Sequence, residues 1–478
     1  MLACAFIPFI KPLKDPAKID SYRAIAASSL ILKLFDYTII ILWGHLLNTD
    51  GLQFGFKQGM STVQCTWLVS EVVNYYINQG NSVITTLLDC SKAFDMCKFS
   101  TIFRKILKKN VPKIVVRALI FVYTKQEAWV RWGNGCSKIF NISNGTRQGS
   151  ILSPAIFSIY IDDLIKDLRK LGLGCRVGGI WMAAVGYADD LLLMAPNRLA
   201  MEKMLEICEK YADMHNLKFS TDENPNKSKS KCIYMFNSRS RTISKPAPLQ
   251  LYGRDLPWVK SATHLGNELF EDGSMEYDCK IKRAKFIDNS LNVREMFEFA
   301  KPREILRAVQ IYCGDMYGSS LWDLYGSVSA KYFRCWNTAV ILCWDVPRST
   351  HTKYVRGFLS CDLLSLRTQC IARYVNFLKS LFECRSKEVA VLSRIVANNV
   401  STITGRNILN IKLETGISPT KTTSKFLQHI LHMQERNVDS KEWDSWLLEK
   451  YLDIRNDQRS KGDNTEYIDS LIISICSS

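Results

Sequence analysis

The hydrophobic pattern of this chain combines strand-like runs with helical repeats in its first half and becomes helical beyond residue 275. Unbroken apolar and β-branched runs at 83–88 and on both sides of 187–190 predict buried strands. Apolar residues three and four apart predict helices at 63–78, 154–171 and 199–216, and a serine cap at 28 or 29 predicts another to about residue 47. The pattern therefore indicates an α+β fold with a mostly antiparallel sheet and helices on one face.

Two adjacent carboxylates interrupt the second of these apolar stretches. Asp189 and Asp190 stand between the runs 183–186 and 191–195, which is typical of a β-hairpin with acidic residues at its turn. Carboxylates are costly to bury unless they are paired or bind metal, and two together repel each other, which favours a bound divalent cation. Asp89 ends the run at 83–88. We therefore expect three hard oxygen ligands on neighbouring strands, able to hold two Mg²⁺ ions for in-line attack at a phosphate.

Composition and charge place the chain among globular proteins with a polyanionic partner. The 478 residues are enough for two or three domains, and the 47% hydrophobic content excludes a disordered chain. The net charge of +17 fits either a solubilising surface or attraction to nucleic acid. The charge is clustered, however, because residues 96–126 contain no acidic residue and eight basic ones. This clustering favours nucleic acid.

The 16 cysteines are scattered without a C-x-x-C pair, which indicates a reduced, intracellular protein rather than a disulfide framework. A C-terminal zinc site would use Cys335, Cys343, His351 and Cys361. The spacings of these residues fit no compact zinc-binding pattern, so we expect the cysteines to be buried free thiols.

The most membrane-like stretch, residues 30–47, is interrupted by Lys33, Asp36 and His45. We therefore expect a core helix and no membrane partner. Residues 1–10 lack a basic region and a small-residue cleavage site, so no signal peptide is expected.

Seven sequence blocks, in a fixed order over roughly residues 1–270, are similar to those of the reverse transcriptase of non-LTR (LINE-type) retrotransposons. The blocks are 11–16 with 21–25, 53–62, 88–95, 145–154, 187–190, 227–232 and 264–266. The stretch 343–352 also resembles a downstream segment of some of these elements. The resemblance implies a right-hand polymerase fold with fingers and palm over 1–274, a helical thumb over 275–345 and a helical C-terminal extension of unknown role over 346–478.

The resemblance assigns the acidic residues to an RNA-directed DNA polymerase centre. Asp89 and Asp189 would bridge two Mg²⁺ ions, which Mn²⁺ can replace, and Asp190 would be the weaker ligand. A primer 3′-hydroxyl would attack the α-phosphate of a deoxynucleotide by two-metal phosphoryl transfer. The alternative is a polar turn with an unrelated acid at the end of a strand.

Three further positions are implied to contact the nucleotide. Phe94 resembles the steric gate, an aromatic plate that would clash with a ribose 2′-hydroxyl, although a core phenylalanine is the alternative. Gln148 resembles the glutamine beside the nascent base pair, and Gly149 would allow close approach of the backbone, unless both form a simple turn. Arg147 either reaches phosphate or faces solvent.

Basic residues are implied to contact the triphosphate. Arg23 resembles the finger arginine whose planar fork clamps phosphate oxygens, although the family usually has proline where this chain has Ala24. Lys229 resembles the lysine that protonates leaving pyrophosphate, but Lys227 and Lys231 are equally open choices, and a solvated basic loop is the alternative.

A further set of residues is implied to bind template and primer through contacts that carry no sequence information. The alternatives are a solvated N-terminal segment, a plain loop and a helix cap. The template set is Lys11, Lys14, Gln53, Phe56, Gly59, Ser61 and Thr62, and the primer grip, which includes His264, is Leu265 and Gly266.

The expected partners are an RNA template, a DNA primer and deoxynucleoside triphosphates, with the oligomeric state left open. The upstream endonuclease of full elements is not recognised, so we expect an N-terminally truncated copy, located in the nucleus or in a cytoplasmic ribonucleoprotein. One alternative is a catalytically idle remnant that only binds nucleic acid. Another is a group II intron maturase-like protein, against which the block 53–62 and the stretch around Trp344 favour the retrotransposon.

Overall fold

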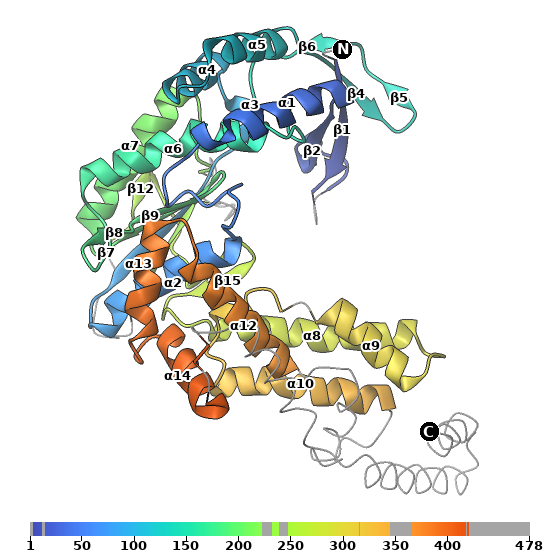
Figure 1. The fold of residues 1–478 in the computed structure, drawn as a ribbon, viewed down its shortest axis with the longest axis vertical. Helices are drawn as coiled ribbons and strands as arrows, with labels where there is room; N and C mark the ends of the chain where they lie inside the picture. Colours follow the sequence, from blue (N-terminus) through green and yellow to red (C-terminus); the bar gives the residue numbers. More distant parts are fainter. Residues whose placement is uncertain are drawn as a thin grey trace, which may run out of the picture. The chain divides into compact units, whose positions relative to one another are not determined.

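The computed structural model describes two compact units (Figure 1). The first contains the residues up to Leu265 together with Leu269–Ser274 and Leu381–Ile395, and the second contains Gly266–Glu268, Met275–Ser380 and those from Val396 onward. The described residues are 3–11, 15–221, 232–238, 247–314, 316–344, 366–416 and 418–419. Six residues singled out in the sequence lie outside them: Lys14, Lys227, Lys229, Lys231, His351 and Cys361.

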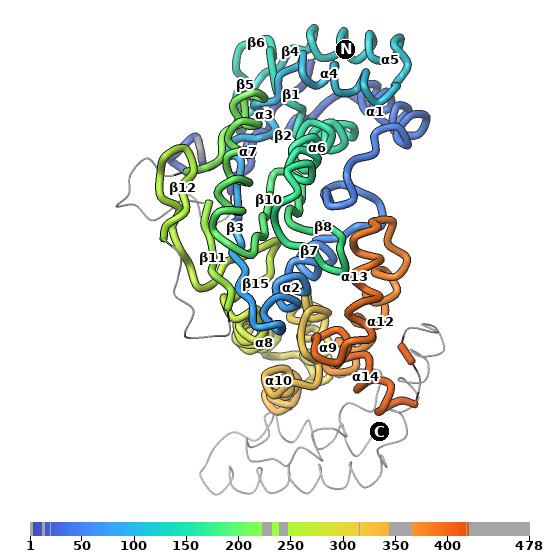
Figure 2. Tube along the Cα trace, turned by 90° about the vertical axis from the view of Figure 1, so that its left-hand side faces the viewer, coloured from blue at the N-terminus to red at the C-terminus, as the bar shows by residue number. Residues whose placement is uncertain are grey.

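The first unit is built on a four-stranded antiparallel sheet. Its order is β11 (Ile233–Asn237), β3 (Val83–Asp89), β10 (Asp190–Ala195) and β9 (Ala184–Tyr187). Figure 2 shows β3 and β10 side by side. The inner strands are almost wholly buried, because their apolar side chains cover both faces. The strands expected from the apolar runs are therefore confirmed.

Three long helices pack against this sheet: α2 (Thr62–Asn78), α6 (Ser153–Leu171) and α7 (Arg198–His215). Their ends follow the local sequence. A capping box of Ser61 and Gln64 begins α2. Gly172, with a φ of 73°, ends α6, as predicted. The predicted bounds of all three helices are correct to within about one residue.

A second sheet contains the N-terminal strands of the first unit. β1 (Cys4–Ile10) pairs antiparallel with β2 (Tyr22–Ala27) and parallel with β4 (Glu127–Trp132), which also pairs with β5 (Gly135–Cys136) and β6 (Phe140–Asn141). Short helices follow β3, and several short strands form hairpins, of which the last strand, β15, includes residues of both units. These elements are α3 (Ala93–Met96), α4 (Phe99–Lys108), α5 (Lys113–Thr124), β7 (Arg176–Val177), β8 (Ile180–Trp181), β12 (Gln250–Leu251), β13 (Arg254–Asp255), β14 (Ser261–His264) and β15 (Asn267–Phe270).

The prediction that the stretch 30–47 is a core helix is wrong. The serine cap is present at Ser29, but α1 (Leu30–Trp43) buries only Leu32, Asp36 and Ile39. Among the described residues Leu30–Leu47 is the one helical stretch whose length and mean hydropathy of 1.6 would suffice to cross a bilayer, and 17% of it is buried. Apolar residues occur on every side of this helix, so the hydrophobic pattern could not indicate which side packs inward.

Part of the basic cluster in residues 96–126 is buried and pairs with acidic residues of α6. Lys105 is buried and its ammonium donates to Asp163 Oδ2 at 2.9 Å and to the Tyr211 hydroxyl at 2.8 Å. Asp162 is fully buried and pairs with Lys166 and with Lys109, the latter at 3.8 Å. The ion pairs join the α4 region to α6 and the hydrogen bond to Tyr211 joins α4 to α7, so part of the basic cluster supports the fold.

Residues far along the chain return to the first unit. Glu388, on α13 (Lys387–Ala397), accepts a hydrogen bond at 2.8 Å from Arg169 on α6. The same guanidinium donates to Asp50 Oδ1 at 2.7 Å. The pair of Arg169 with the largely buried Glu388 anchors α13 beside the end of α6.

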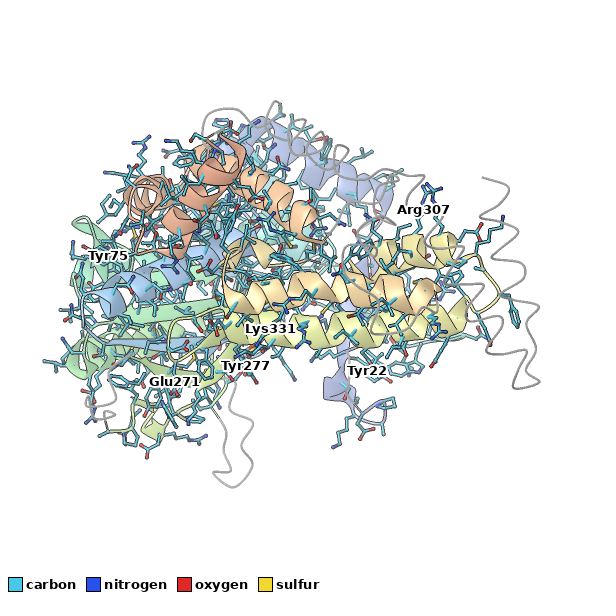
Figure 3. All side chains as sticks on the ribbon, turned by 90° about the horizontal axis from the view of Figure 1, so that it is seen from below. Tyr22, Tyr75, Glu271, Tyr277, Arg307 and Lys331 are labelled. Carbon is cyan, nitrogen blue, oxygen red and sulfur yellow. The ribbon has the colours of Figure 1, made fainter. Side chains whose placement is uncertain are left out.

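The second unit is helical. It contains α8 (Glu276–Met296), α9 (Pro302–Cys313), α10 (Ser327–Trp344), α12 (Leu366–Phe382) and α14 (Ile403–Thr415). Tyr277 on α8 and Lys331 on α10 are labelled where these two helices run together (Figure 3). Cys335 and Cys343 are buried free thiols on α10, as expected for those two residues.

Candidate active site

The sheet brings the predicted acidic residues to one end of two neighbouring strands. Asp190 lies directly opposite Asp89 in the register of β10 and β3, and it also pairs with Tyr187 across the β9–β10 hairpin. The turn consists of Ala188 and Asp189, and Ala188 has a φ of 57°, which is strained for a residue with a side chain. Directly opposed residues have Cβ atoms about 5 Å apart, so the carboxylates share one small region.

Two buried thiols lie within electrostatic reach of these carboxylates, Cys90 near Asp89 and Asp189, and Cys65 near Asp190. Burial raises the pKa of the Cys90 thiol, and the charges of Asp189 and Asp89 raise it further. Burial also raises the pKa of Cys65, with Asp190 adding to the effect. Negative charge therefore accumulates at this end of the sheet, which suits a bound cation.

The donor set is chemically suited to a hard divalent ion, because carboxylate oxygens are the ligands that Mg²⁺ prefers. Within the described part of the chain, however, no three Asp, Glu, His or Cys side chains form a ready-made metal cluster. The backbone therefore brings the three aspartates to one edge without holding their side chains in a ligand geometry.

Ser220 orients the first of the carboxylates, a role that no motif in the sequence indicated. Its hydroxyl donates to Asp89 Oδ2 at 2.9 Å, and its backbone N–H donates to the Asp89 carbonyl at 2.8 Å. The Ser91 hydroxyl lies 2.7 Å from the Ser220 hydroxyl and extends this chain of hydrogen bonds. Asp89 is thus fixed through its main chain and its side chain.

The structure corrects the assignment of Gln53 to a template groove. Gln53 is fully buried, so its side chain cannot touch a template. Its Oε1 accepts from the backbone N–H of Gly55 at 2.9 Å and of Ala188 at 3.1 Å, and its Nε2 donates to the Ala188 carbonyl at 3.5 Å. The amide therefore supports the strained turn that carries Asp189.

Phe94 lies in an aromatic group that leaves it partly exposed. Its ring stacks on Phe157 with centroids 4.3 Å apart and planes inclined by 19°. Phe56 meets it edge-on at 6.3 Å. Phe157 is fully buried and Phe56 is exposed, so the Phe94 ring is supported from the core and faces outward. This placement is compatible with a rigid plate.

The loop of residues 145–150 joins the segment that carries Phe94 to β2. The Thr146 N–H donates to the Phe94 carbonyl at 2.7 Å, and the Gln148 carbonyl accepts from the Ala26 N–H at 2.6 Å. The Gln148 amide donates to Asp95 Oδ1 at 3.3 Å. Gly149 has a φ of 107°, and a Cβ there would lie 2.9 Å from the Ala26 carbonyl, so glycine is required.

Neither alternative considered for Arg147 is correct. Its side chain is buried and lies 3.6 Å from Asp36 Oδ1 on α1. Its guanidinium lies over the Tyr123 ring, 5.2 Å from the centroid. It therefore reaches neither phosphate nor solvent and holds the loop from inside the protein.

The remaining residues predicted to contact nucleotide or template differ in their exposure and in their roles in the fold. Arg23 is exposed on β2, opposite Phe9, and Lys11 is partly exposed. Phe56 and Gly59 lie in the loop before α2, and Ser61 and Thr62 lie at its start, where the Ser61 hydroxyl accepts from the Gln64 N–H at 3.2 Å. Ser61 is thus the helix cap that the sequence offered as its alternative role.

The predicted primer grip is a tight hairpin turn. Leu265 and Gly266 separate β14 from β15, with φ values of 49° and 78°. Two successive residues with positive φ are typical of the turns that join two antiparallel strands. His264, which precedes the turn, is buried, and its Nδ1 lies 3.1 Å from the Thr66 hydroxyl on α2.

His264 gives a prediction for stability at acid pH. Burial lowers the pKa of His264 to about 4. Since the unfolded chain binds a proton near pH 6.5 and the folded chain does not, the free energy of unfolding should fall by about 2–3 kcal/mol between pH 6.5 and 4.5 through this residue. Denaturant titrations at both pH values should show a smaller fall for His264→Gln. The exposed His45 provides the control, and an equal fall for His45→Gln and His264→Gln would contradict the prediction.

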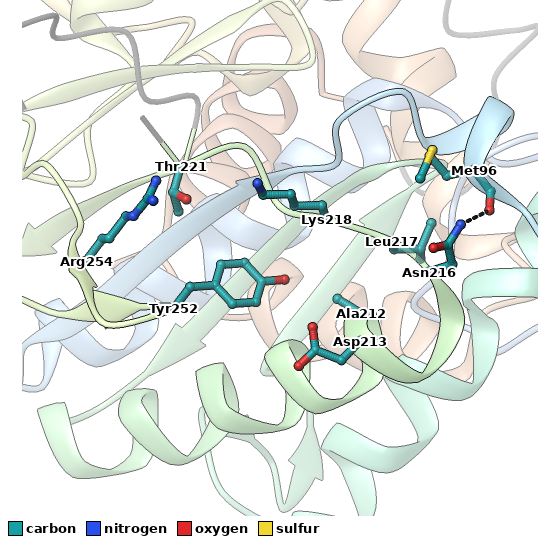
Figure 4. A pocket seen from close by; sticks show the side chains of 9 residues that line it. All are labelled: Met96, Ala212, Asp213, Asn216, Leu217, Lys218, Thr221, Tyr252 and Arg254. Carbon is teal, nitrogen blue, oxygen red and sulfur yellow. Dashed lines mark hydrogen bonds between the residues drawn. The ribbon is translucent and has the colours of Figure 1, made fainter. Parts of the chain in front are cut away.

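A cavity of about 470 Å³ has a lining that includes none of the predicted site residues (Figure 4). Asn216 donates to the Met96 carbonyl at 3.1 Å on its wall, and Lys218 and Arg254 supply positive charge. Its lining is Met96, Ala212, Asp213, Asn216, Leu217, Lys218, Thr221, Tyr252 and Arg254. None of the predicted nucleotide-binding residues lines this cavity. The candidate active site is therefore the end of β3 and β10 that carries Asp89 and Asp190.

Comparison with known families decides what kind of protein carries this sheet. The family model described as reverse transcriptase (RNA-dependent DNA polymerase) matches residues 12–268, which is more than half of the chain. This chain belongs to the reverse transcriptase family. The match includes Asp89, the Asp189–Asp190 pair and the loop 145–150. The expected α+β polymerase fold is therefore confirmed, and the described residues beyond α8 are helical as expected.

The curated relatives are retrotransposon proteins. The chain is 25% identical over 218 residues to the Pol polyprotein of retrotransposable element R2DM of Drosophila melanogaster, covering 46% of this chain and 20% of that protein. It is 24% identical over 386 residues to the probable RNA-directed DNA polymerase from transposon BS of the same species, covering 76% and 40%. The predicted resemblance to non-LTR reverse transcriptases is thus confirmed.

The chain spans between a fifth and two fifths of the length of these two relatives. Among solved structures, it is similar to apo telomerase from Candida tropicalis at 10% identity and a TM-score of 0.38, covering 89% of this chain and 68% of that one.

Proposed function

We propose that this chain is an RNA-directed DNA polymerase of a non-LTR retrotransposon, which adds deoxynucleotides to a primer 3′-hydroxyl. The observation that carries the proposal is the register of β3 and β10. It sets Asp89 opposite Asp190, with Asp189 in the adjoining turn, inside the segment matched by the reverse transcriptase family. Three carboxylates at one edge of a sheet are the donors that this transfer requires.

The family implies dependence on a divalent metal ion. Asp89, Asp189 and Asp190 would hold two Mg²⁺ ions, with Mn²⁺ as a substitute, and bound metal would stabilise the charge that develops on the reacting phosphate. Ser220 and Gln53 position these donors. Ser220 holds the Asp89 carboxylate, and Gln53 supports the turn that carries Asp189. This prior positioning removes motion that would otherwise oppose the reaction.

The other partners of the proposed reaction are an RNA template, a DNA primer and deoxynucleoside triphosphates. The net charge of +17 and the exposed Arg23 support binding to phosphates. Gln148, Gly149 and Phe94 lie around one loop, which supports their contact with a single nucleotide.

The direct test is extension of a labelled DNA primer on an RNA template by the purified chain with Mg²⁺ and deoxynucleotides. Labelled product that disappears with a chelator is the expected result. Retained binding of the primer–template without extension would favour the idle remnant over the polymerase.

Phe94→Ala should allow incorporation of ribonucleotides. Removing the plate supported by Phe157 removes the clash with the 2′-hydroxyl, so discrimination against ribonucleotides should fall by about a hundredfold. Single-nucleotide extension with matched deoxy- and ribonucleotides measures this ratio. Phe99→Ala removes an equal volume from α4 and should leave the ratio unchanged. Unaltered sugar selection in Phe94→Ala would exclude the gate.

A further inference from the structure

Helix α1 carries a carboxylate at the centre of its buried side. The three buried residues of this helix are Leu32, Asp36 and Ile39, four and three positions apart, which places them on one stripe. An acidic residue is rarely fully buried unless a partner holds it there. The partners of Asp36 therefore indicate why this helix is docked where it is.

The two side chains that pair with Asp36, those of Ser150 and Arg147, belong to the loop 145–150. Asp36 Oδ2 accepts a hydrogen bond from the Ser150 hydroxyl, and Asp36 Oδ1 lies 3.6 Å from Arg147 Nη2. The exposed fractions of the Arg147 and Asp36 side chains are 2% and 1%. Tyr123, on α5, covers the guanidinium. The pair is consequently shielded from salt and water, where breaking it has a large effect.

The same loop presents its other residues outward. Gln148 is partly exposed and Gly149 is exposed, whereas Arg147 and Ser150 on either side of them are buried. The Ser150 N–H donates to the Arg147 carbonyl at 3.1 Å, which closes a turn around Gln148 and Gly149. A turn tied at both ends to one carboxylate has little freedom to move its two central residues.

We propose that Asp36 is a positioning residue that, through Arg147 and Ser150, holds the loop 145–150 so that Gln148 and Gly149 meet the incoming nucleotide. Only the second part of this inference, that the held loop meets the nucleotide, rests on the proposed polymerase function. The first half, that Asp36 immobilises the loop, concerns the protein without substrate. Asp36 itself touches no substrate, since its side chain is buried.

The test compares Asp36→Asn with Asp162→Asn. Both substitutions neutralise a fully buried carboxylate that pairs with a basic side chain in the first unit, but Asp162 pairs with Lys109 and Lys166, not with the loop. Amide hydrogen exchange of residues 145–152 is measured without substrate, and KM and kcat for the next deoxynucleotide are measured in single-nucleotide extension.

Asp36→Asn should accelerate exchange in the loop and raise the nucleotide KM about tenfold, with the affinity for primer–template unchanged. Asp162→Asn should lower thermal stability without either change. The double variant Asp36→Asn/Arg147→Gln, which removes the unpaired buried cation, should recover stability but not the KM, because the loop is still unanchored.

Loop exchange that is equal in the two single variants would overturn the proposal. A loosened loop with an unchanged KM would overturn the nucleotide role. If the parent chain does not extend a primer, the polymerase function and the nucleotide role both fail, while the exchange measurement still decides whether Asp36 anchors the loop.

Discussion

Asp189→Asn is expected to lower metal-dependent primer extension by at least about a thousandfold. The substitution keeps the shape of the hairpin turn but removes one of the carboxylates that would hold the metal, so the loss falls on the chemical step. The measurement is the single-turnover rate of nucleotide addition on an RNA template, beside the affinity for the same primer–template, which should stay within about twofold because the substitution leaves basic contacts intact.

The control for this variant is Asp213→Asn. Asp213 is exposed on α7, lines the cavity and is not one of the proposed metal ligands, so Asp213→Asn makes the same change in charge outside the proposed metal site. It should extend the primer at the parental rate. Equal rates for the parent and Asp189→Asn would remove Asp189 from the reaction.

The parts of the site that the sequence predicted are those that depend on neighbours along the chain. An apolar run that ends in an acid predicted β3 and Asp89, and two apolar runs around Asp189–Asp190 predicted the hairpin. Apolar residues at helical spacing predicted α2, α6 and α7. Each of these signals lies within one element, where side-chain spacing and backbone preference suffice.

The parts that were missed depend on partners far away in sequence. Gln53 meets Ala188 across 135 positions, and Asp36 meets Ser150 across 114. No local pattern distinguishes a buried amide that supports a turn from one that faces a template, because the residue type suits both roles. For the same reason, Arg147 was expected at phosphate or in solvent although it is an internal cation.

Gln53→Met should slow nucleotide addition about a hundredfold. Methionine has nearly the same length and volume, but it cannot accept from the Gly55 and Ala188 N–H groups or donate to the Ala188 carbonyl. Buried groups left unpaired cost about 1–3 kcal/mol each, and the strained turn at Ala188 would relax and displace Asp189. A displacement of about 1 Å at a reacting group is enough for a loss of this size.

The rate of a single turnover per active molecule separates this effect from simple loss of folded protein. Asn74→Leu is the matched control: the Asn74 amide is also buried and donates to the carbonyls of Ser70 and Gly273, away from the hairpin. Both variants should lower the melting temperature, but only Gln53→Met should slow the chemical step. If the two variants retained the same turnover rate, the buried amide would stabilise the fold without positioning Asp189, and the alignment of that carboxylate would have to come from β9 and β10 alone.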